Sequence, residues 1–416
     1  MLRVKPFLRL SPAATVWLLG LSQIIGYGTL YYSFSILAGG IARSFAWPVA
    51  WAYGSFSLAL LAGGVIAPLV GRRIDRHGAA IVMALGSVLC ALALLGTAFA
   101  PNGIVFTLGL VATQAASALV LYDAAFAALV QATGTEARKR ITHLTLIAGF
   151  ASTLFWPLTS WLQAGLDWRQ ILLAFAALNL VLCLPIHGLL AVQRPPADHD
   201  HPARPDEPGT PPAARLSGPE RRLLALVTLG FALSNFALSA VLAQMVPTLT
   251  ALGLGASALL VSTLFGPSQV LVRLVNMLLG ERRHPLAAAL VGLSMTPLAL
   301  LVLMLTAPAG AGAVGFAILL GFGSGLKSIV QGTLPLALFG RAAYGSRLGV
   351  MAAARQILSA VAPFAFAALT GAFGTTTALG VLVIAGALGL GALLEVARVH
   401  YSAREPARTE VLPAER

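Results

Sequence analysis

The sequence predicts an all-α membrane protein in which twelve transmembrane helices form two pseudo-symmetric six-helix bundles. Three observations lead to this prediction. Hydrophobic residues make up 58% of the 416-residue chain, charged residues only 10%, and the mean hydropathy is +0.87. Apolar runs of about 20 residues, the length that crosses a bilayer, fill almost the whole chain. One polar, proline-rich stretch separates these runs into two sets of six.

Short polar connections, such as the one at Pro101–Gly103, separate most of the predicted spans. The spans themselves are continuous apolar segments without repeated charges, which favours membrane helices over soluble ones. They are expected at residues 14–38, 49–70, 79–99, 104–131, 141–164, 170–193, 223–247, 256–280, 286–306, 313–339, 348–370 and 376–398.

The stretch 194–221 is rich in proline and charge and has no apolar period. Such a composition buries too little apolar surface to fold and is typical of a disordered linker. We therefore expect an N-terminal six-helix bundle over residues 1–193 and a cytoplasmic linker over 194–221. A C-terminal six-helix bundle with a short cytoplasmic tail follows over 222–416.

The placement of lysine and arginine predicts the orientation. Of the 27 such residues, 22 lie in the N-terminus, the even-numbered loops, the linker and the tail, whereas only Arg43 and Arg169 lie in odd-numbered loops. Cytoplasmic loops carry the excess of positive charge, so both termini and the linker are expected in the cytoplasm of a bacterial inner membrane. The net charge of +13 follows from this topology, and no nucleic-acid partner is expected. The first apolar run is too long for a signal peptide, so the first helix is expected to remain.

Residue types that hold metals or nucleotides are sparse. Cys90 and Cys183 are lone thiols within apolar spans, which favours packing roles. Residues 321–328 read GFGSGLKS and resemble a phosphate loop only in part, because Leu326 replaces the glycine before the lysine. We expect no metal, no cofactor and no enzymatic activity. A membrane-embedded enzyme or sensor would need a catalytic constellation or an attached soluble domain.

Residues 71–78, between the second and third spans, read GRRIDRHG and follow the pattern G-x-x-x-D-R-x-G. This resembles the signature loop of the major facilitator superfamily, and residues 280–285 keep an acidic–arginine pair at the equivalent place in the second half. The resemblance covers the whole chain and implies alternating access between two six-helix halves. Its candidate conformational residues are Gly71, Asp75, Arg76 and Gly78.

The carboxylate of Asp75 is expected to cap the cytoplasmic start of the eleventh helix, near Gly345–Arg347. A helix N-terminus presents free N–H groups and partial positive charge, so it attracts an anion. Gly71 and Gly78 allow a close approach and a tight turn. In the resembled family, this contact ties the halves together when the cytoplasmic side is closed.

Four ionisable residues lie deep inside the predicted spans: Asp123, Arg273, Lys327 and Arg355. A charge at the bilayer centre costs roughly 2.5 kcal/mol or more, so such residues usually face a cavity or a partner. All four lie on helices that line the central cavity of the resembled fold. One acid against three bases leaves a positive surplus, which suits an anionic substrate.

Gln269-Val270-Leu271-Val272-Arg273, followed eight residues later by Glu281, is similar to the bacterial monocarboxylate-transporter branch of that superfamily. A guanidinium binds a carboxylate through two parallel hydrogen bonds. Arg273 has the alternative of pairing with Asp123 or with the carbonyls of a broken helix. The candidate substrate-binding residues are Arg273, Lys327, Gln269, Asn235, Tyr31 and Tyr122.

Asp123 is the one deep carboxylate of the spans and has three possible roles. A carboxyl group that is alternately buried and paired with a cation can take up and release a proton, which would couple transport to protons. Asp123 and Arg355 lie at similar depths and could instead form an ion pair that closes the cytoplasmic gate. The third alternative is an aspartate that is satisfied by packing.

The expected function is proton-coupled secondary active transport of a small organic anion, such as a carboxylate, by alternating access. The expected partners are the small-molecule substrate, protons and membrane lipids, and the expected state is a monomer. The alternative is an efflux pump that exports a larger amphipathic metabolite, such as a siderophore or a drug.

Replacing Pro195–Pro212 in the linker with a Gly/Ser segment of equal length should leave the transport rate within a few-fold of the native rate. Chain entropy and reach are the expected contributions of this segment, and both are kept by the replacement. Transport assays at matched membrane abundance test this. A large loss of activity would indicate a docking or regulatory role instead.

Overall fold

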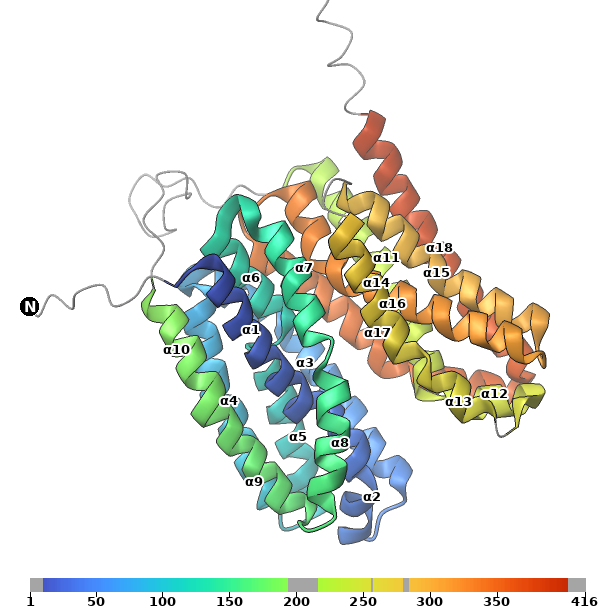
Figure 1. Ribbon diagram of the computed structural model, residues 1–416, viewed down its shortest axis with the longest axis horizontal. Coiled ribbons are helices and arrows are strands. Elements are labelled where there is room, and N and C mark those ends of the chain that lie inside the picture. The colour runs from blue at the N-terminus through green and yellow to red at the C-terminus, as the bar shows by residue number, and fades with distance from the viewer. Residues whose placement is uncertain (1–9, 194–215, 256, 280–283, 403–416) are drawn as a thin grey trace, which may run out of the picture. The chain divides into compact units, whose positions relative to one another are not determined.

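Helices account for the regular structure of the computed structural model, which describes residues 10–193, 216–255, 257–279 and 284–402 (Figure 1). No strand occurs among these residues, and the predicted all-α class is confirmed. Eleven helical stretches of the described chain are long and apolar enough to cross a membrane. One of them, residues 103–163, contains two of the twelve predicted spans.

The chain consists of two compact units. Of the described residues, the first unit holds 10–193, 270–279 and 331–360, and the second holds 216–255, 257–269, 284–330 and 361–402. Segments of three later helices, within residues 270–279 and 331–360, are therefore grouped with the N-terminal helices. The division into two halves at the linker stays a prediction, and most of that linker lies outside the described residues.

The N-terminal part of the chain forms ten α-helices, which are interrupted by π-helical and 3₁₀ segments. They are α1 (Pro12–Tyr27), η1 (Gly28–Tyr32), α2 (Phe34–Ser44), α3 (Val49–His77), α4 (Ala79–Ala98), α5 (Gly103–Ser117), α6 (Tyr122–Thr133), η2 (Gly134–Glu136), α7 (Ala137–Ala148), α8 (Ala151–Gln163), α9 (Trp168–Leu178), η3 (Asn179–Cys183) and α10 (Leu184–Val192).

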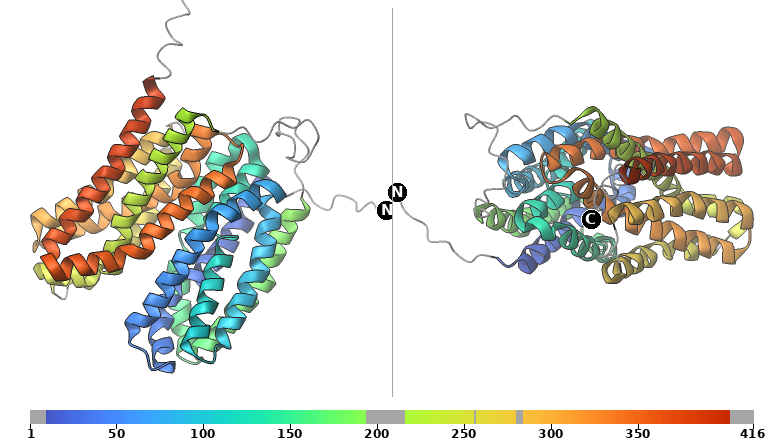
Figure 2. Two further views of the ribbon diagram at one scale, coloured as in Figure 1. Left: turned by 180° about the vertical axis from the view of Figure 1, so that it is seen from behind. Right: turned by 90° about the horizontal axis from the view of Figure 1, so that it is seen from above.

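The C-terminal part begins at Gly218, four residues before the end of the predicted linker, where Ser217 and Glu220 form a capping box. In this part, α11 and α15 both pack along α18 (Figure 2). The elements are α11 (Gly218–Ala243), α12 (Met245–Leu249), η4 (Thr250–Leu254), α13 (Ser257–Thr263), α14 (Phe265–Leu279), α15 (Pro285–Thr306), α16 (Gly310–Phe339), α17 (Tyr344–Phe373) and α18 (Thr375–Ser402).

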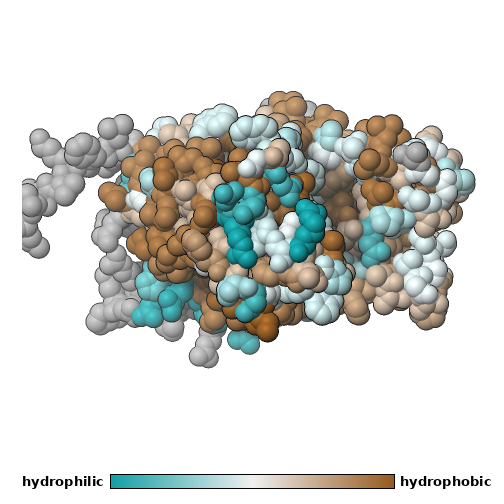
Figure 3. Space-filling view, turned by 90° about the horizontal axis from the view of Figure 1, so that it is seen from below, coloured by the Kyte–Doolittle hydropathy of each residue, from teal (hydrophilic) through white to brown (hydrophobic). Residues whose placement is uncertain are grey.

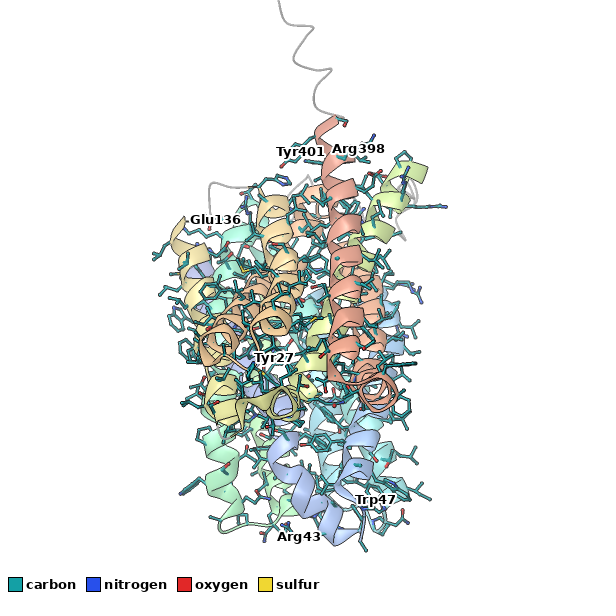
Figure 4. The ribbon with its side chains drawn as sticks, turned by 90° about the vertical axis from the view of Figure 1, so that its right-hand side faces the viewer. Tyr27, Arg43, Trp47, Glu136, Arg398 and Tyr401 are labelled. Carbon is teal, nitrogen blue, oxygen red and sulfur yellow. The ribbon has the colours of Figure 1, made fainter. Side chains whose placement is uncertain are left out.

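The odd and even connections lie at opposite ends of the first unit. Arg43, in the last turn of α2, and Trp47, between α2 and α3, lie at one end, and Glu136, between α6 and α7, lies at the other (Figure 4). Tyr27, where α1 passes into η1, lies between them (Figure 4). This separation matches the loop order that underlies the predicted orientation.

The segment predicted as a signature loop is helical over most of its length, which corrects the expectation of a loop. Helix α3 continues through Gly71 and Asp75, with Arg76 in its last turn, and ends at His77. Only Gly78 leaves the helix, with φ of +90°, a conformation that glycine adopts without strain. The helix continues because no residue between Val70 and His77 breaks it.

Glycines bring α3 and the start of α17 into close contact within the first unit. A Cβ atom on Gly71 would collide with the carbonyl oxygen of Gly345 and lie 3.0 Å from Cα of Ser346. A Cβ atom on Gly345 would lie 2.7 Å from Oδ1 of Asp75. Gly349, one turn further along, meets the backbone of Ala67 and Pro68 in the same way. The two backbones can approach this closely only because these positions lack side chains.

The close approach lets Asp75 cap α17, as the sequence predicted. The N–H of Gly345 donates to Oδ1 of Asp75 at 2.8 Å, and the N–H of Ser346 donates to Oδ2 at 2.7 Å. The Ser346 hydroxyl donates to the same Oδ2. These amides belong to the first turn of α17, where N–H groups have no partner within the helix.

Replacing Asp75 with Asn should weaken this cap while leaving membrane insertion intact. The amide offers one acceptor oxygen in place of two and lacks the negative charge, a loss of about 1–2 kcal/mol. Hydrogen exchange of the Gly345 and Ser346 amides should accelerate roughly 5- to 30-fold, and transport kinetics should change.

The matched control is Asp167→Asn. Asp167 caps its own helix, α9, by accepting from the N–H of Gln170 at 2.8 Å. It should leave exchange at residues 345 and 346 unchanged. Native exchange rates in Asp75→Asn would show that the carboxylate does not hold the start of α17.

Candidate functional site

A break in the predicted fourth span positions Asp123. The sequence predicted one helix over 104–131, but α5 ends at Ser117 and α6 begins at Tyr122. Asp123 thus lies in the first turn of a new helix, where a negative charge is favourable. Gln23 of α1 donates its side-chain amide to the Val120 carbonyl at 2.7 Å, which satisfies a backbone group freed by the break.

Asp123 forms an ion pair with Arg355 of α17, within the first unit. Nη2 of Arg355 donates to Oδ2 of Asp123 at 3.0 Å, and the two side chains are 13% and 22% exposed, respectively. Among the described residues, Oδ1 of Asp123 is buried and accepts no hydrogen bond. The Asp123–Arg355 ion pair that the sequence left as one alternative is therefore present.

Aromatic side chains gather next to this pair. The ring centroids of Tyr27 and Tyr122 are 4.6 Å apart, and Tyr32 lies 6.0 Å from Tyr27. Tyr31 is in edge contact with Tyr32 at 5.4 Å, and Trp156 of α8 donates its indole N–H to the Tyr32 carbonyl at 3.1 Å. The cluster collects residues from α1, η1, α6 and α8.

Tyr31 and Tyr32 both lie in the π-helical segment η1. Its wider turn changes the spacing of side chains along the first span, and such segments are frequent at functional sites. Gln114 of α5 donates to the Leu30 carbonyl at 2.6 Å within this segment. The Thr29 hydroxyl accepts from Asn179 of η3 at 3.1 Å, so a second π-helical segment holds the first.

Arg273 of α14 is 6% exposed and reaches the same region of the first unit. Its guanidinium lies against Gly149, between α7 and α8, so closely that a Cβ atom there would collide with Nη1. The guanidinium lies close enough to the hydroxyls of Tyr32 and Tyr122 to interact with them electrostatically. Arg273 therefore lies near Tyr32 and Tyr122, and Tyr31 reaches this region through its contact with Tyr32. The substrate-binding role of Arg273, Tyr31 and Tyr122 stays a prediction.

The other three predicted substrate-binding residues belong to the second unit. Gln269 of α14 donates its amide to the Ser324 hydroxyl of α16 at 2.8 Å, and Asn235 lies on α11 at intermediate exposure. Lys327 of α16 is 4% exposed. Its ammonium is held by oxygen atoms of Ser234 and Thr296.

The two arginines of the predicted odd-numbered loops differ in their contacts. Arg169 donates to the carbonyls of Ala98 and Ala100 at 2.7 and 2.8 Å and lies 4.3 Å from the ring centre of Trp168, so it fastens the ends of helices. Arg43 borders an open hollow of about 440 Å³ at the ends of α2 and α8, with Gln163. In the view from below, hydrophilic side chains form a small group within a largely hydrophobic surface (Figure 3).

Gln23, Gln114 and Asn179 were missed by sequence reasoning. All three are buried, and each bonds a group in or beside an irregular helical segment. The only sequence signal is an amide side chain inside an apolar span. Cys90 and Cys183 are buried thiols, and no group of three or more His, Cys, Asp or Glu in the described part of the chain is arranged to hold a metal ion.

Solved structures of transporters share this fold. The human organic anion transporter MFSD10 (TETRAN) matches with a TM-score of 0.71 and 16% identity over 92% of this chain and 100% of that chain. A variant of the E. coli fucose:proton symporter FucP matches with a TM-score of 0.67 and 16% identity, over 93% of this chain and 99% of that chain. The proton:xylose symporter XylE matches with a TM-score of 0.70 and 13% identity, over 93% of this chain and 96% of that chain. At these identities the likeness is one of fold alone.

None of the curated proteins matches the chain in sequence. The model of the Major Facilitator Superfamily matches residues 16–363, which is most of the chain. The apolar helices, the Asp75 cap and the similar transporter structures agree with that match. The chain is a multi-pass membrane protein and belongs to the Major Facilitator Superfamily of transporters.

Proposed function

We propose that this transporter moves a small organic anion, of the carboxylate class, together with protons by alternating access. The observation that carries the proposal is the buried guanidinium of Arg273 beside the tyrosine cluster and Gly149. A charge at membrane depth costs roughly 2.5–3.5 kcal/mol on insertion scales. Charged residues are kept at this depth mainly where they contact a substrate or line an ion pathway.

The charge balance of the first unit supports an anion. Asp123 and Arg355 neutralise each other through their ion pair, so Arg273 contributes the surplus positive charge among the deep residues of this unit. The planar guanidinium matches a carboxylate with two parallel hydrogen bonds. The likeness of residues 269–273 to the monocarboxylate-transporter branch supports the same substrate class.

We assign the Asp123–Arg355 pair to the gate. It joins α6 to α17 within the first unit, and α17 is the helix whose first turn Asp75 caps. A pair between two helices that must separate during transport can hold one conformation and release the other. The cellular setting we propose is a bacterial inner membrane, with a monomer whose termini and linker lie in the cytoplasm.

Efflux of a larger amphipathic metabolite is the second candidate. It is supported by the aromatic cluster, since Tyr31 and Trp156 are 39% and 47% exposed and offer apolar faces wider than a small carboxylate needs. Outward transport in inverted vesicles, together with poor selectivity for charge, would favour this candidate over anion symport.

Arg273→Lys should weaken binding of carboxylates by about 1.5–3 kcal/mol, because it keeps the charge and loses the two-point contact. Arg273→Ala should abolish anion transport. Thermal shifts of the purified protein against C2–C6 mono- and dicarboxylates and their uncharged amides measure the binding. A folded Arg273→Ala protein with native affinity would falsify the anion site.

Gly149→Ala tests the position of the guanidinium without changing any charge. The backbone at Gly149 is right-handed helical and accepts alanine, but the new methyl group would displace Nη1 of Arg273. Carboxylate binding should therefore weaken in this variant as well. Gly165→Ala is the matched control, because a Cβ atom there has open space.

Exchanging the charges of the gate pair, Asp123→Arg with Arg355→Asp, should restore transport that either single change abolishes. Removing one partner of a buried pair costs up to about 3–5 kcal/mol, and the exchange re-forms the pair. The control exchange is Glu136→Arg with Arg140→Glu, an exposed pair at 2.7 Å within one turn. It should change stability by about 0.5 kcal/mol or less. An inactive but folded Asp123/Arg355 exchange would contradict the gate assignment.

A further inference from the structure

Lys327 is a buried lysine of the second unit whose neighbours are neutral. It lies in α16, 4% exposed, and its Nζ lies 3.2 Å from the Ser234 carbonyl, 3.0 Å from the Ser234 hydroxyl and 3.5 Å from the Thr296 hydroxyl. Among the described residues, no carboxylate forms an ion pair with it. The predicted role in anion binding does not explain this enclosure.

Close packing of α15 against α16 encloses the ammonium. A Cβ atom on Gly292 would lie 3.0 Å from Cβ of Leu326 and 3.5 Å from the backbone nitrogen of Lys327. A Cβ atom on Gly323 would lie 3.0 Å from the Gly292 carbonyl oxygen and 3.4 Å from the Thr296 hydroxyl. The two glycines thus bring the Thr296 hydroxyl within reach of Lys327.

The atoms around Nζ suit both protonation states of the side chain. An ammonium donates three hydrogen bonds, and a carbonyl and two hydroxyls can accept them. A neutral amine donates two and accepts one, and either hydroxyl can donate to it because a hydroxyl both donates and accepts. Losing the proton therefore leaves no buried polar group unpaired, whereas a carboxylate partner would have held the charge in place.

The charged groups of α11 and the histidine before α15 are far from the neighbours of Lys327 along their helices. Ser234 is twelve residues from Arg222 and Thr296 twelve from His284, about 18 Å of helix in each case. Arg273 on α14 follows Gln269, whose amide contacts α16 at Ser324, by four residues and belongs to the first unit. The titratable groups on α11, before α15 and on α18 are Glu220, Arg221, Arg222, His284, Glu395, Arg398, His400 and Tyr401.

We infer that Lys327 is the group that carries the coupling proton, an inference that rests on the proposed proton coupling. An N–H bond of the ammonium breaks, the electron pair stays on Nζ, and water admitted in another conformation takes the proton. The reverse step reloads the amine from the other side of the membrane. A buried ammonium is less favourable than a hydrated one, so the protonation state biases the equilibrium between conformations.

Double electron–electron resonance tests this without any substrate. Spin labels are placed at Gly165→Cys and Thr376→Cys, one exposed position in each unit, with Cys90→Ala and Cys183→Ala as background. Distance distributions are measured between pH 5 and pH 9. In the native background, the ratio of the two populations should change by up to about tenfold per pH unit across the transition.

Lys327→Met keeps the length without the charge, and Lys327→Arg keeps a charge that is not lost at these pH values. In both variants the populations of the two conformations should no longer depend on pH. Lys327→Met should favour the conformation of the neutral amine, and Lys327→Arg that of the ammonium. Asp123→Asn breaks the gate pair and should shift the two populations at every pH, but their ratio should still change with pH. Thr296→Val removes one hydroxyl partner of Lys327 and should move the pH at which the populations change. This variant keeps the test decisive if Lys327→Met does not fold.

A native protein without pH-dependent populations would overturn the inference. So would folded Lys327→Met and Lys327→Arg proteins with the native response, or loss of the response in Asp123→Asn alone. Carboxylate binding to Arg273 variants is measured separately. Failure at Lys327 therefore leaves the anion site standing, and failure at Arg273 leaves the proton site standing.

Discussion

Polar groups inside a membrane must find their partners within the protein, and the irregular parts of this chain follow from that constraint. The hydrocarbon core offers no water, so a backbone group freed by a helix break costs several kcal/mol unless a side chain reaches it. Gln23 reaches the Val120 carbonyl beside the α5–α6 break, and Gln114 reaches the Leu30 carbonyl in η1. The Gln23 contact helps a helix N-terminus, and with it Asp123, to lie inside a membrane span, and the Gln114 contact does the same for the π-helical segment η1.

The same constraint accounts for the glycines that join helices at their crossings. Gly71, Gly345 and Gly349 let the backbones of α3 and α17 approach until Asp75 meets the first amides of α17. Gly292 and Gly323 play the equivalent part between α15 and α16, where the enclosed group is the ammonium of Lys327. Close approach encloses the polar contact at Lys327, whereas the Asp75 cap lies at the exposed end of α3.

The deep charges divide into three kinds by their partners. Asp123 and Arg355 satisfy each other across two helices. Arg273 lies among tyrosines and against a glycine at a helix break, which suits a ligand that brings its own negative charge. Lys327 is surrounded by hydroxyls that tolerate either protonation state. A gate, a substrate site and a proton site are the functions that these three environments favour, and the proposed proton-coupled transport by alternating access would use all three.

Composition and apolar run length determined the all-α membrane class and the approximate positions of the spans, and the resemblance of residues 71–78 to a family signature led to the Asp75 cap on α17. Hydrophobicity and the pattern around Asp75 are properties of the local sequence, so they can be read without contacts. The break before Tyr122, the π-helical segments and the pairing of Asp123 with Arg355 were decided by tertiary structure. Each depends on which side chain from a distant helix arrives to satisfy a buried group. Residues 118–121 contain no glycine or proline that would predict the break. The sequence around Lys327 likewise gives no sign that the hydroxyls of Ser234 and Thr296 surround its ammonium.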